Sequence, residues 1–147
     1  MFRPVQLAIA TPLIAVLAAG GCGRAADSNS ASKFDGAQKP VAQAIEDFQK
    51  AAEKGDERKI CDTLITAKLK AQIARANSKT AKDCAQAMSE GLNDTDQSDL
   101  TVTAVKLAGP TAATATVKQK LSDRKSRSTS VKLEKVGTSW RIAELPA

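Results

Sequence analysis

The feature that most constrains the fold is a change of hydrophobic period partway along the chain. Between residues 39 and 90, apolar side chains recur three and four positions apart, as on one face of a helix. Between residues 100 and 143 they mostly alternate with polar side chains, as in strands with one buried face. Helices followed by strands predict an α+β domain, in which N-terminal helices pack on one face of an antiparallel sheet.

The strongest helical pattern covers residues 39–54. Pro40 suits the first turn and Gly55 suits the position just past the end. The charged residues, Glu46 among them, fall mainly on the side opposite the apolar face. That face consists of Val41, Ala44, Ile45, Phe48, Ala51 and Ala52.

Two further helices are expected before the strands. Asp56 can cap the second, whose pattern continues to Ile73 with a bend expected near Ala67–Lys68. Thr80 and Asp83 form an approximate capping box for a third, short helix over residues 81–90. The inward residues of that third helix are expected to be Cys84, Ala87 and Met88.

Four strands joined by short turns are expected to form a curled antiparallel meander. The first, over residues 100–107, changes face in its second half, which indicates a bulge or twist at Ala104–Val105. Several inner positions carry small residues, so either the helices fill the space or a shallow apolar pocket remains. The residues predicted to line this pocket or core are Phe48, Ala104, Ala113, Ala115 and Trp140.

The first 22 residues have the pattern of an export signal. Arg3 supplies a positive charge, residues 7–17 form an apolar centre, and small residues follow. Gln6, Thr11 and Pro12 interrupt the run, which makes a permanent membrane span the less favoured interpretation.

The end of this leader, Ala19-Gly20-Gly21-Cys22, resembles the bacterial lipobox, although that motif usually has Leu where this chain has Ala19. The resemblance implies that Cys22 carries fatty acyl chains such as palmitate and anchors an exported protein to the outer face of a membrane. The alternative is an ordinary signal cut near Ala19 with an incidental cysteine. We therefore expect a signal peptide over residues 1–21, an acylated cysteine and flexible tether over 22–38, and an α+β domain over 39–147.

Cys61 and Cys84 are the other two cysteines of the chain. In an exported protein, two cysteines on apolar helix faces predict a disulfide. Redox catalysis would favour a closer Cys-x-x-Cys pair, and a metal site would need further ligands, with histidine lacking from the sequence. No metal or other cofactor is expected.

The net charge of +6 is concentrated in the strand region. Residues 99–147 contain nine Lys and Arg against four Asp and Glu, whereas residues 22–98 are balanced. A solvated face explains this most simply, and attraction to anionic lipid headgroups is a second interpretation. Nucleic acid is not expected as a partner, because the strands lack the aromatic residues on which bases stack.

Helices followed by a curled four-stranded sheet are similar to the cone-shaped fold of nuclear transport factor two, also described as cystatin-like. The residues of the resemblance are Ala44-x3-Phe48-x2-Ala51-x3-Gly55-Asp56-x4-Cys61-x2-Leu64, Cys84, and Gly137-x2-Trp140-Arg141-Ile142. This pattern resembles small actinobacterial lipoproteins of uncharacterised function. The first strand pair of the full fold is missing, which shortens the expected sheet.

Three functions remain open from the sequence. The favoured one is a non-catalytic, membrane-anchored domain that binds an envelope protein or a small apolar ligand at the mouth of the cone. The second is an isomerase- or dehydratase-like enzyme, as the fold resemblance allows; without His or Tyr, its acid–base groups would have to be carboxylates such as Asp62 or Asp83. The third is a basic module lying against an anionic membrane.

Overall fold

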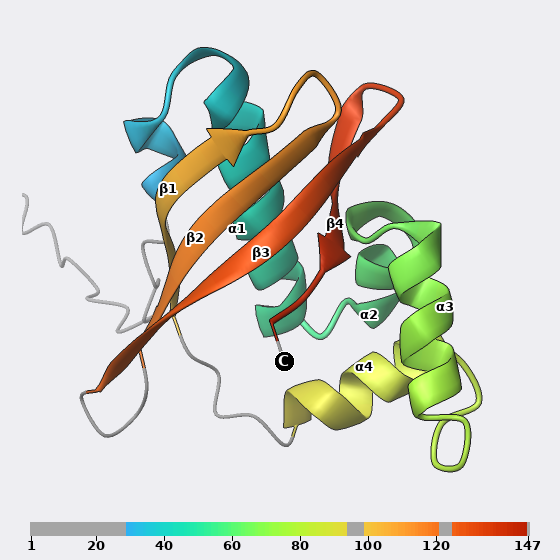
Figure 1. Cartoon of the computed structure of the whole chain (residues 1–147). Coiled ribbons are helices and arrows are strands. Elements are labelled where there is room, and N and C mark those ends of the chain that lie inside the picture. Colours follow the sequence, from blue (N-terminus) through green and yellow to red (C-terminus); the bar gives the residue numbers. More distant parts are fainter. Residues whose placement is uncertain (1–28, 94–98, 121–124, 147) are drawn as a thin grey trace, which may run out of the picture.

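Figure 1 shows a computed structural model of the whole chain, which describes residues 29–93, 99–120 and 125–146. The described part is an α+β fold, with N-terminal helices packed on a four-stranded antiparallel meander of order β1-β2-β3-β4. This confirms the predicted fold class. The predicted leader, Cys22 and residues 23–28 of the predicted tether lie outside the described residues.

The elements follow one another along the chain as expected for helices first and strands second. The helical elements are η1 (Ser30–Lys33), η2 (Gly36–Gln38), α1 (Lys39–Glu53), α2 (Glu57–Lys59), η3 (Ile60–Leu64), α3 (Ala67–Ala76) and α4 (Cys84–Asn93). The strands are β1 (Leu100–Leu107), β2 (Ala112–Lys120), β3 (Ser126–Val136) and β4 (Ser139–Glu144). Within the described residues, no helix is long and apolar enough to cross a membrane.

Helix α1 lies behind the sheet in Figure 1, inside its curl, and α2, α3 and α4 lie beyond β4. The predicted apolar face is buried against the sheet, with Val41 fully enclosed and Ile45 and Phe48 at 2% and 8% exposure. Gly55, with a φ of +65°, ends the helix in a conformation that other residues rarely adopt.

The second predicted helix is interrupted: in place of one bent helix, the chain forms α2, the turn η3 and α3. Asp56 caps α2 by accepting a hydrogen bond from Lys59 N at 3.2 Å, as predicted. After the π-helical turn η3, however, Ile65 becomes extended and forms a parallel bridge with Ile142 of β4. Thr66 then caps a new helix, α3, with its hydroxyl 3.2 Å from Leu69 N. The break therefore exists because β4 pairs with the chain at this point.

Helix α4 begins at Cys84, three residues later than predicted, because Asp83 is its cap. The Asp83 carboxylate accepts a hydrogen bond from Gln86 N at 2.9 Å, whereas Thr80 caps nothing and its hydroxyl binds Asn77 O. The predicted inward residues Cys84, Ala87 and Met88 are all buried. Cys84 is bonded to Cys61 of η3, which confirms the predicted disulfide and joins α4 to the other helices.

The sheet has its bulge at Thr103, one residue before the predicted position. Val102 lies opposite Val117 and Ala104 lies opposite Thr116, which leaves Thr103 as the extra residue of β1. Because of this extra residue, side chains three positions apart point to the same face of the sheet, so Val102 and Val105 are both buried in the core. The extra residue also turns Ala104 outward, where it is exposed. The prediction that Ala104 lines the inner face is therefore wrong.

The ordered domain begins before residue 39, so the predicted tether is too long. Ser30 and Ala31 are 3% and 2% exposed and pack on α1. Glu46 of α1, predicted to lie on the polar side, is only 2% exposed. Its carboxylate accepts hydrogen bonds from Ala31 N at 2.6 Å and from Ser30 Oγ at 3.3 Å. These contacts are between residues distant in the sequence, and composition alone does not reveal them.

Side chains from η1, η2 and α1 cover the outer edge of β1. Val102 N donates to Ser30 Oγ at 3.1 Å, and Leu100 N donates to Gln49 Oε1 at 3.3 Å. Gln38 Nε2 donates to Val105 O at 2.8 Å. Backbone groups that an edge strand would otherwise present to another chain are thus occupied.

Replacing both Cys61 and Cys84 by alanine should lower the free energy of unfolding by about 3.5 kcal/mol, because the disulfide closes a loop whose ends are separated by 23 positions. Urea denaturation measures this change. In the unaltered protein, unfolded without reductant, peptide mapping after thiol alkylation should find both cysteines blocked. Recovery of both as free, alkylated thiols would contradict the disulfide.

Glu46→Ala should lower the free energy of unfolding by roughly 2 kcal/mol, because it leaves the buried Ala31 N–H without its acceptor. Asp47→Ala is the matched control, since Asp47 is only partly buried and accepts a bond from Gln43 on the same helix. Hydrogen exchange should show loss of protection at Ala31 and Val102 in Glu46→Ala alone. Equal destabilisation by the two variants would contradict this role of Glu46.

Candidate functional site

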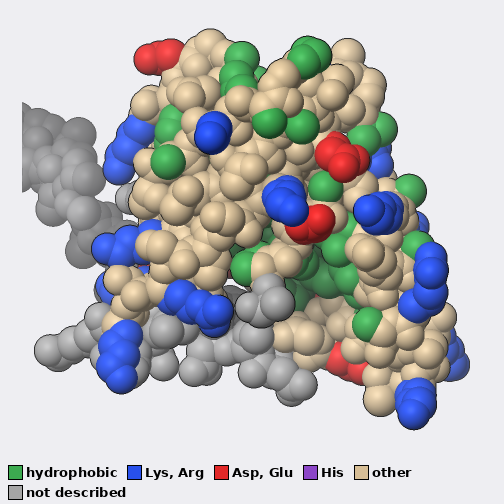
Figure 2. Space-filling view, in the orientation of Figure 1, with side chains coloured by type: hydrophobic (Ala, Val, Ile, Leu, Met, Phe, Trp, Pro, Cys, Tyr) green, Lys and Arg blue, Asp and Glu red, His purple; other side chains and the backbone are tan. Residues whose placement is uncertain are grey.

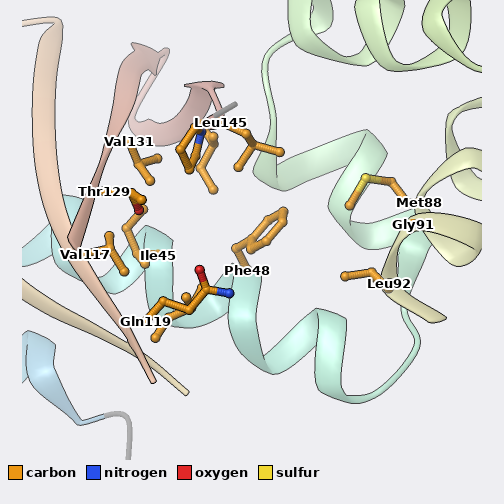
Figure 3. Close-up of a pocket in the computed structure, with 13 residues that line it drawn as sticks. Ile45, Phe48, Met88, Gly91, Leu92, Val117, Gln119, Thr129, Val131 and Leu145 are labelled. Carbon is orange, nitrogen blue, oxygen red and sulfur yellow. The ribbon is translucent and has the colours of Figure 1, made fainter. Parts of the chain in front are cut away.

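A cavity of about 360 Å³ opens between the sheet, α1 and α4. Figure 3 shows Phe48 near its centre, pointing from α1 into the space. Val117 and Val131 of the sheet lie on one side, and Met88 and Leu92 of α4 lie on the other. Figure 1 shows α4 below α1 and α3, clear of the strands, and α4 contributes Met88, Gly91 and Leu92 to the cavity lining.

The walls of the cavity are almost wholly apolar. None of the described residues that line it is ionisable, and the polar side chains among them are those of Gln119 and Thr129. The complete lining consists of Ile45, Phe48, Met88, Gly91, Leu92, Leu100, Val117, Gln119, Thr129, Val131, Ile142, Leu145 and Pro146. Such a surface favours apolar groups, since burial of apolar area is the attraction it offers.

The rim of the cavity combines apolar and cationic groups. Leu145, which follows β4, is 38% exposed, and Figure 2 shows hydrophobic side chains in a hollow beside the C-terminal end of the chain. Arg127 of β3 lies directly opposite Gln119 of β2, and both belong to the inner face of the sheet by their register. Directly opposed residues have Cβ atoms about 5 Å apart, which places the exposed Arg127 next to the cavity lining.

The residues predicted for a pocket or core divide into three groups. Phe48 lines the cavity. Ala113, Ala115 and Trp140 are buried in the hydrophobic core but do not line it. Ala104, as described above, faces outward.

Sequence reasoning did not identify most of the cavity lining. Met88 was predicted to point inward, and Ile45 and Phe48 to lie on an apolar helix face, but hydrophobic period does not show that these positions surround one space. Leu92, Leu145 and Pro146 lie in segments with no pattern that points to a site. They line the same cavity because of the path that α4 takes and the path of the chain after β4.

The two carboxylates considered for catalysis lie away from the cavity. Asp62 is exposed, and Lys70 Nζ donates to its Oδ1 at 2.6 Å. This hydrogen bond, together with the charge of Lys70, lowers the pKa of the Asp62 carboxyl below its ordinary value. Asp83 is the cap of α4. The described residues contain no group of His, Cys, Asp and Glu side chains that could hold a metal ion.

The excess of cations is distributed over the outer face of the sheet, which is turned toward the viewer in Figure 2. Lys106, Lys118 and Lys132 are exposed there, and Figure 2 shows Lys and Arg side chains separated by other residues. Lys132 Nζ is 2.7 Å from Glu144 Oε2, and its hydrogen bond lowers the pKa of the Glu144 carboxyl.

Comparison with known proteins finds a distant structural likeness. No protein-family model matches the chain, and no curated protein matches it. A solved structure from Xanthomonas campestris, described as a calcium/calmodulin dependent protein kinase II association domain, is similar with a TM-score of 0.41 and 14% identity. The match covers 74% of this chain and 84% of the other. At this distance the likeness carries no functional argument, and the assignment of the fold rests on the element order and sheet topology.

Proposed function

We propose that this protein is an exported, lipid-anchored protein whose domain binds an apolar group, without catalysis, in the cavity between the sheet, α1 and α4. The observation that carries this proposal is the apolar lining of that cavity around Phe48. A volume of about 360 Å³ is at the lower end of the range usual for ligand sites. It suits one apolar moiety better than a large cofactor.

The chemistry of the cavity favours binding over catalysis. General acid–base chemistry needs an ionisable group within hydrogen-bond reach of the bound molecule. The described lining residues offer the Gln119 amide and the Thr129 hydroxyl, which can orient a ligand by hydrogen bonding but do not exchange protons near neutral pH. The exposed Asp62 and the helix-capping Asp83 lie outside this lining.

The proposed anchor rests on the sequence of the leader. Residues 19–22 resemble a lipobox, and a mature bacterial lipoprotein carries two or three acyl chains, enough for stable attachment where one chain alone binds only marginally. Attachment at Cys22 would hold the cavity close to the outer face of the membrane. In this arrangement, the apolar group would come from a membrane or envelope component.

Filling the cavity should abolish binding of an apolar probe. We would reconstitute the full chain in lipid nanodiscs and add a fatty acid carrying a photoreactive diazirine. Mass spectrometry should locate the label on peptides containing Phe48, Met88 or Val131. Thr129→Trp, which places an indole in the cavity, should remove most of this labelling.

The matched control is Thr116→Trp, the same substitution on the outer face of the adjacent strand. It should leave the labelling of cavity peptides unchanged. If label is found elsewhere on the domain, or if Thr129→Trp is labelled as strongly as the control, the cavity is not the binding site.

Cys22→Ser should prevent acylation of the chain. Palmitate labelling should be lost, and the protein should appear in the medium or accumulate as the uncut precursor. Ser28→Ala, in the same segment, is the control and should be labelled normally. Unchanged lipid labelling and membrane association of Cys22→Ser would rule out the lipid anchor at this residue.

A further inference from the structure

The exposed edges of the sheet differ in whether other described residues hydrogen-bond to their backbone. The edge of β1 is occupied by Ser30, Gln38 and Gln49, as described above. The edge of β4 is covered by the chain before α3, where Ile65 bridges Ile142 and Thr66 N donates to Ile142 O at 2.9 Å. Strand β3, however, is longer than β4, which pairs with it only from Lys132 to Val136. No described residue pairs with the remaining edge of β3, from Ser126 to Val131.

The backbone groups on this edge can be identified from the register of β2 and β3. Lys135 N donates to Thr111 O on the β2 side, and the pairing of these strands continues without a shift from Glu134 to Ser126. Because hydrogen bonds alternate in direction along an antiparallel strand, Ser126, Ser128 and Ser130 direct their N–H and C=O groups away from β2. All three residues are exposed.

This open edge adjoins the cavity. Thr129 and Val131, which alternate with these serines, both line it. An extended chain paired with the edge would therefore direct every second side chain toward the same apolar space that surrounds Phe48.

The charges near the open edge of β3 limit which kind of segment can bind there. Strand β2 contains Lys118 and Lys120 and no acidic residue, and β3 contains Arg127 and no acidic residue before Glu134. The exposed Asp99 lies at the same end but precedes β1, on the other side of β2 from β3. A second copy of this chain, paired through the same edge, would bring two Arg127 side chains together. A segment with Asp or Glu would instead complement these cations.

We propose that the edge of β3 from Ser126 to Ser130 binds an extended, acidic peptide segment of a partner protein as an added strand, with an apolar side chain of that segment in the cavity. This inference rests on the proposed function, because it names the source of the apolar group. Backbone hydrogen bonds would provide general affinity, and the cavity and Arg127 would select the side chains.

A displayed library of random eight-residue peptides tests the proposal. The full chain in nanodiscs is the bait, and empty nanodiscs remove lipid binders. Selected peptides should combine Asp or Glu with an apolar residue and strand-forming neighbours. On binding, hydrogen exchange should slow at the amides of Ser126, Ser128 and Ser130.

Two variants, each with a control, test the backbone of the edge and its charge. Ser128→Pro removes one N–H of the open edge, a position where proline is tolerated in sheets, and should weaken peptide binding about tenfold. The conservative Ser128→Thr keeps that N–H and should restore binding. Arg127→Glu should reverse the preference from acidic to basic peptides, and Lys106→Glu on β1 should not.

The outcomes distinguish the two proposals. If no peptide is selected, or if Ser128→Pro binds the selected peptides as the unaltered chain does, the added-strand proposal is wrong, while fatty-acid labelling of the cavity still decides the proposed function. If the peptides bind the edge but Thr129→Trp has no effect on them, the cavity does not take their side chain. Dimerisation of the chain that is lost in Ser128→Pro would instead assign the edge to a second copy.

Discussion

The hydrogen bonds of the Glu46 carboxylate hold three parts of the domain together. Glu46 is buried in the middle of α1, and a carboxylate in that position is costly unless hydrogen bonds satisfy it. Ser30 and Ala31 supply them, and Ser30 in turn accepts the hydrogen bond of Val102 N in β1. The start of the domain, the central helix and the first strand are therefore positioned by one connected group of polar contacts.

Together with the disulfide, these contacts determine which surfaces the domain leaves available. The segment before α1 occupies the β1 edge, and Cys61 and Cys84 hold α4 against the other helices, beyond β4. With α4 held there, the space under β2 and β3 remains open around Phe48. The apolar cavity thus adjoins the part of β3 that pairs with no described residue on its outer side.

Several features could be predicted because they depend on neighbours within a few residues. The buried face of α1, the Asp56 cap and the inward residues of α4 follow from local period and capping chemistry. A bend was expected near Ala67–Lys68, but the complete break at Ile65–Thr66 depends on pairing with β4. The outward turn of Ala104 depends on a bulge at Thr103 and could not be predicted either. A shift of one residue in a strand exchanges its faces, so a small error of position changed the side to which Ala104 was assigned.

The sequence by itself determined the α+β class, the apolar face of α1 and the pairing of Cys61 with Cys84. These features depend on residue type and on the hydrophobic period of neighbouring residues. The export signal and the acylation of Cys22 are predictions from the sequence alone. Only the tertiary structure decided that Glu46 is buried, that residues from α1, α4, the sheet and the C-terminal end surround one cavity, and that part of β3 pairs with no other described residue on its outer side. Each of these depends on contacts between segments far apart in the chain, and hydrophobic period carries no information about such contacts.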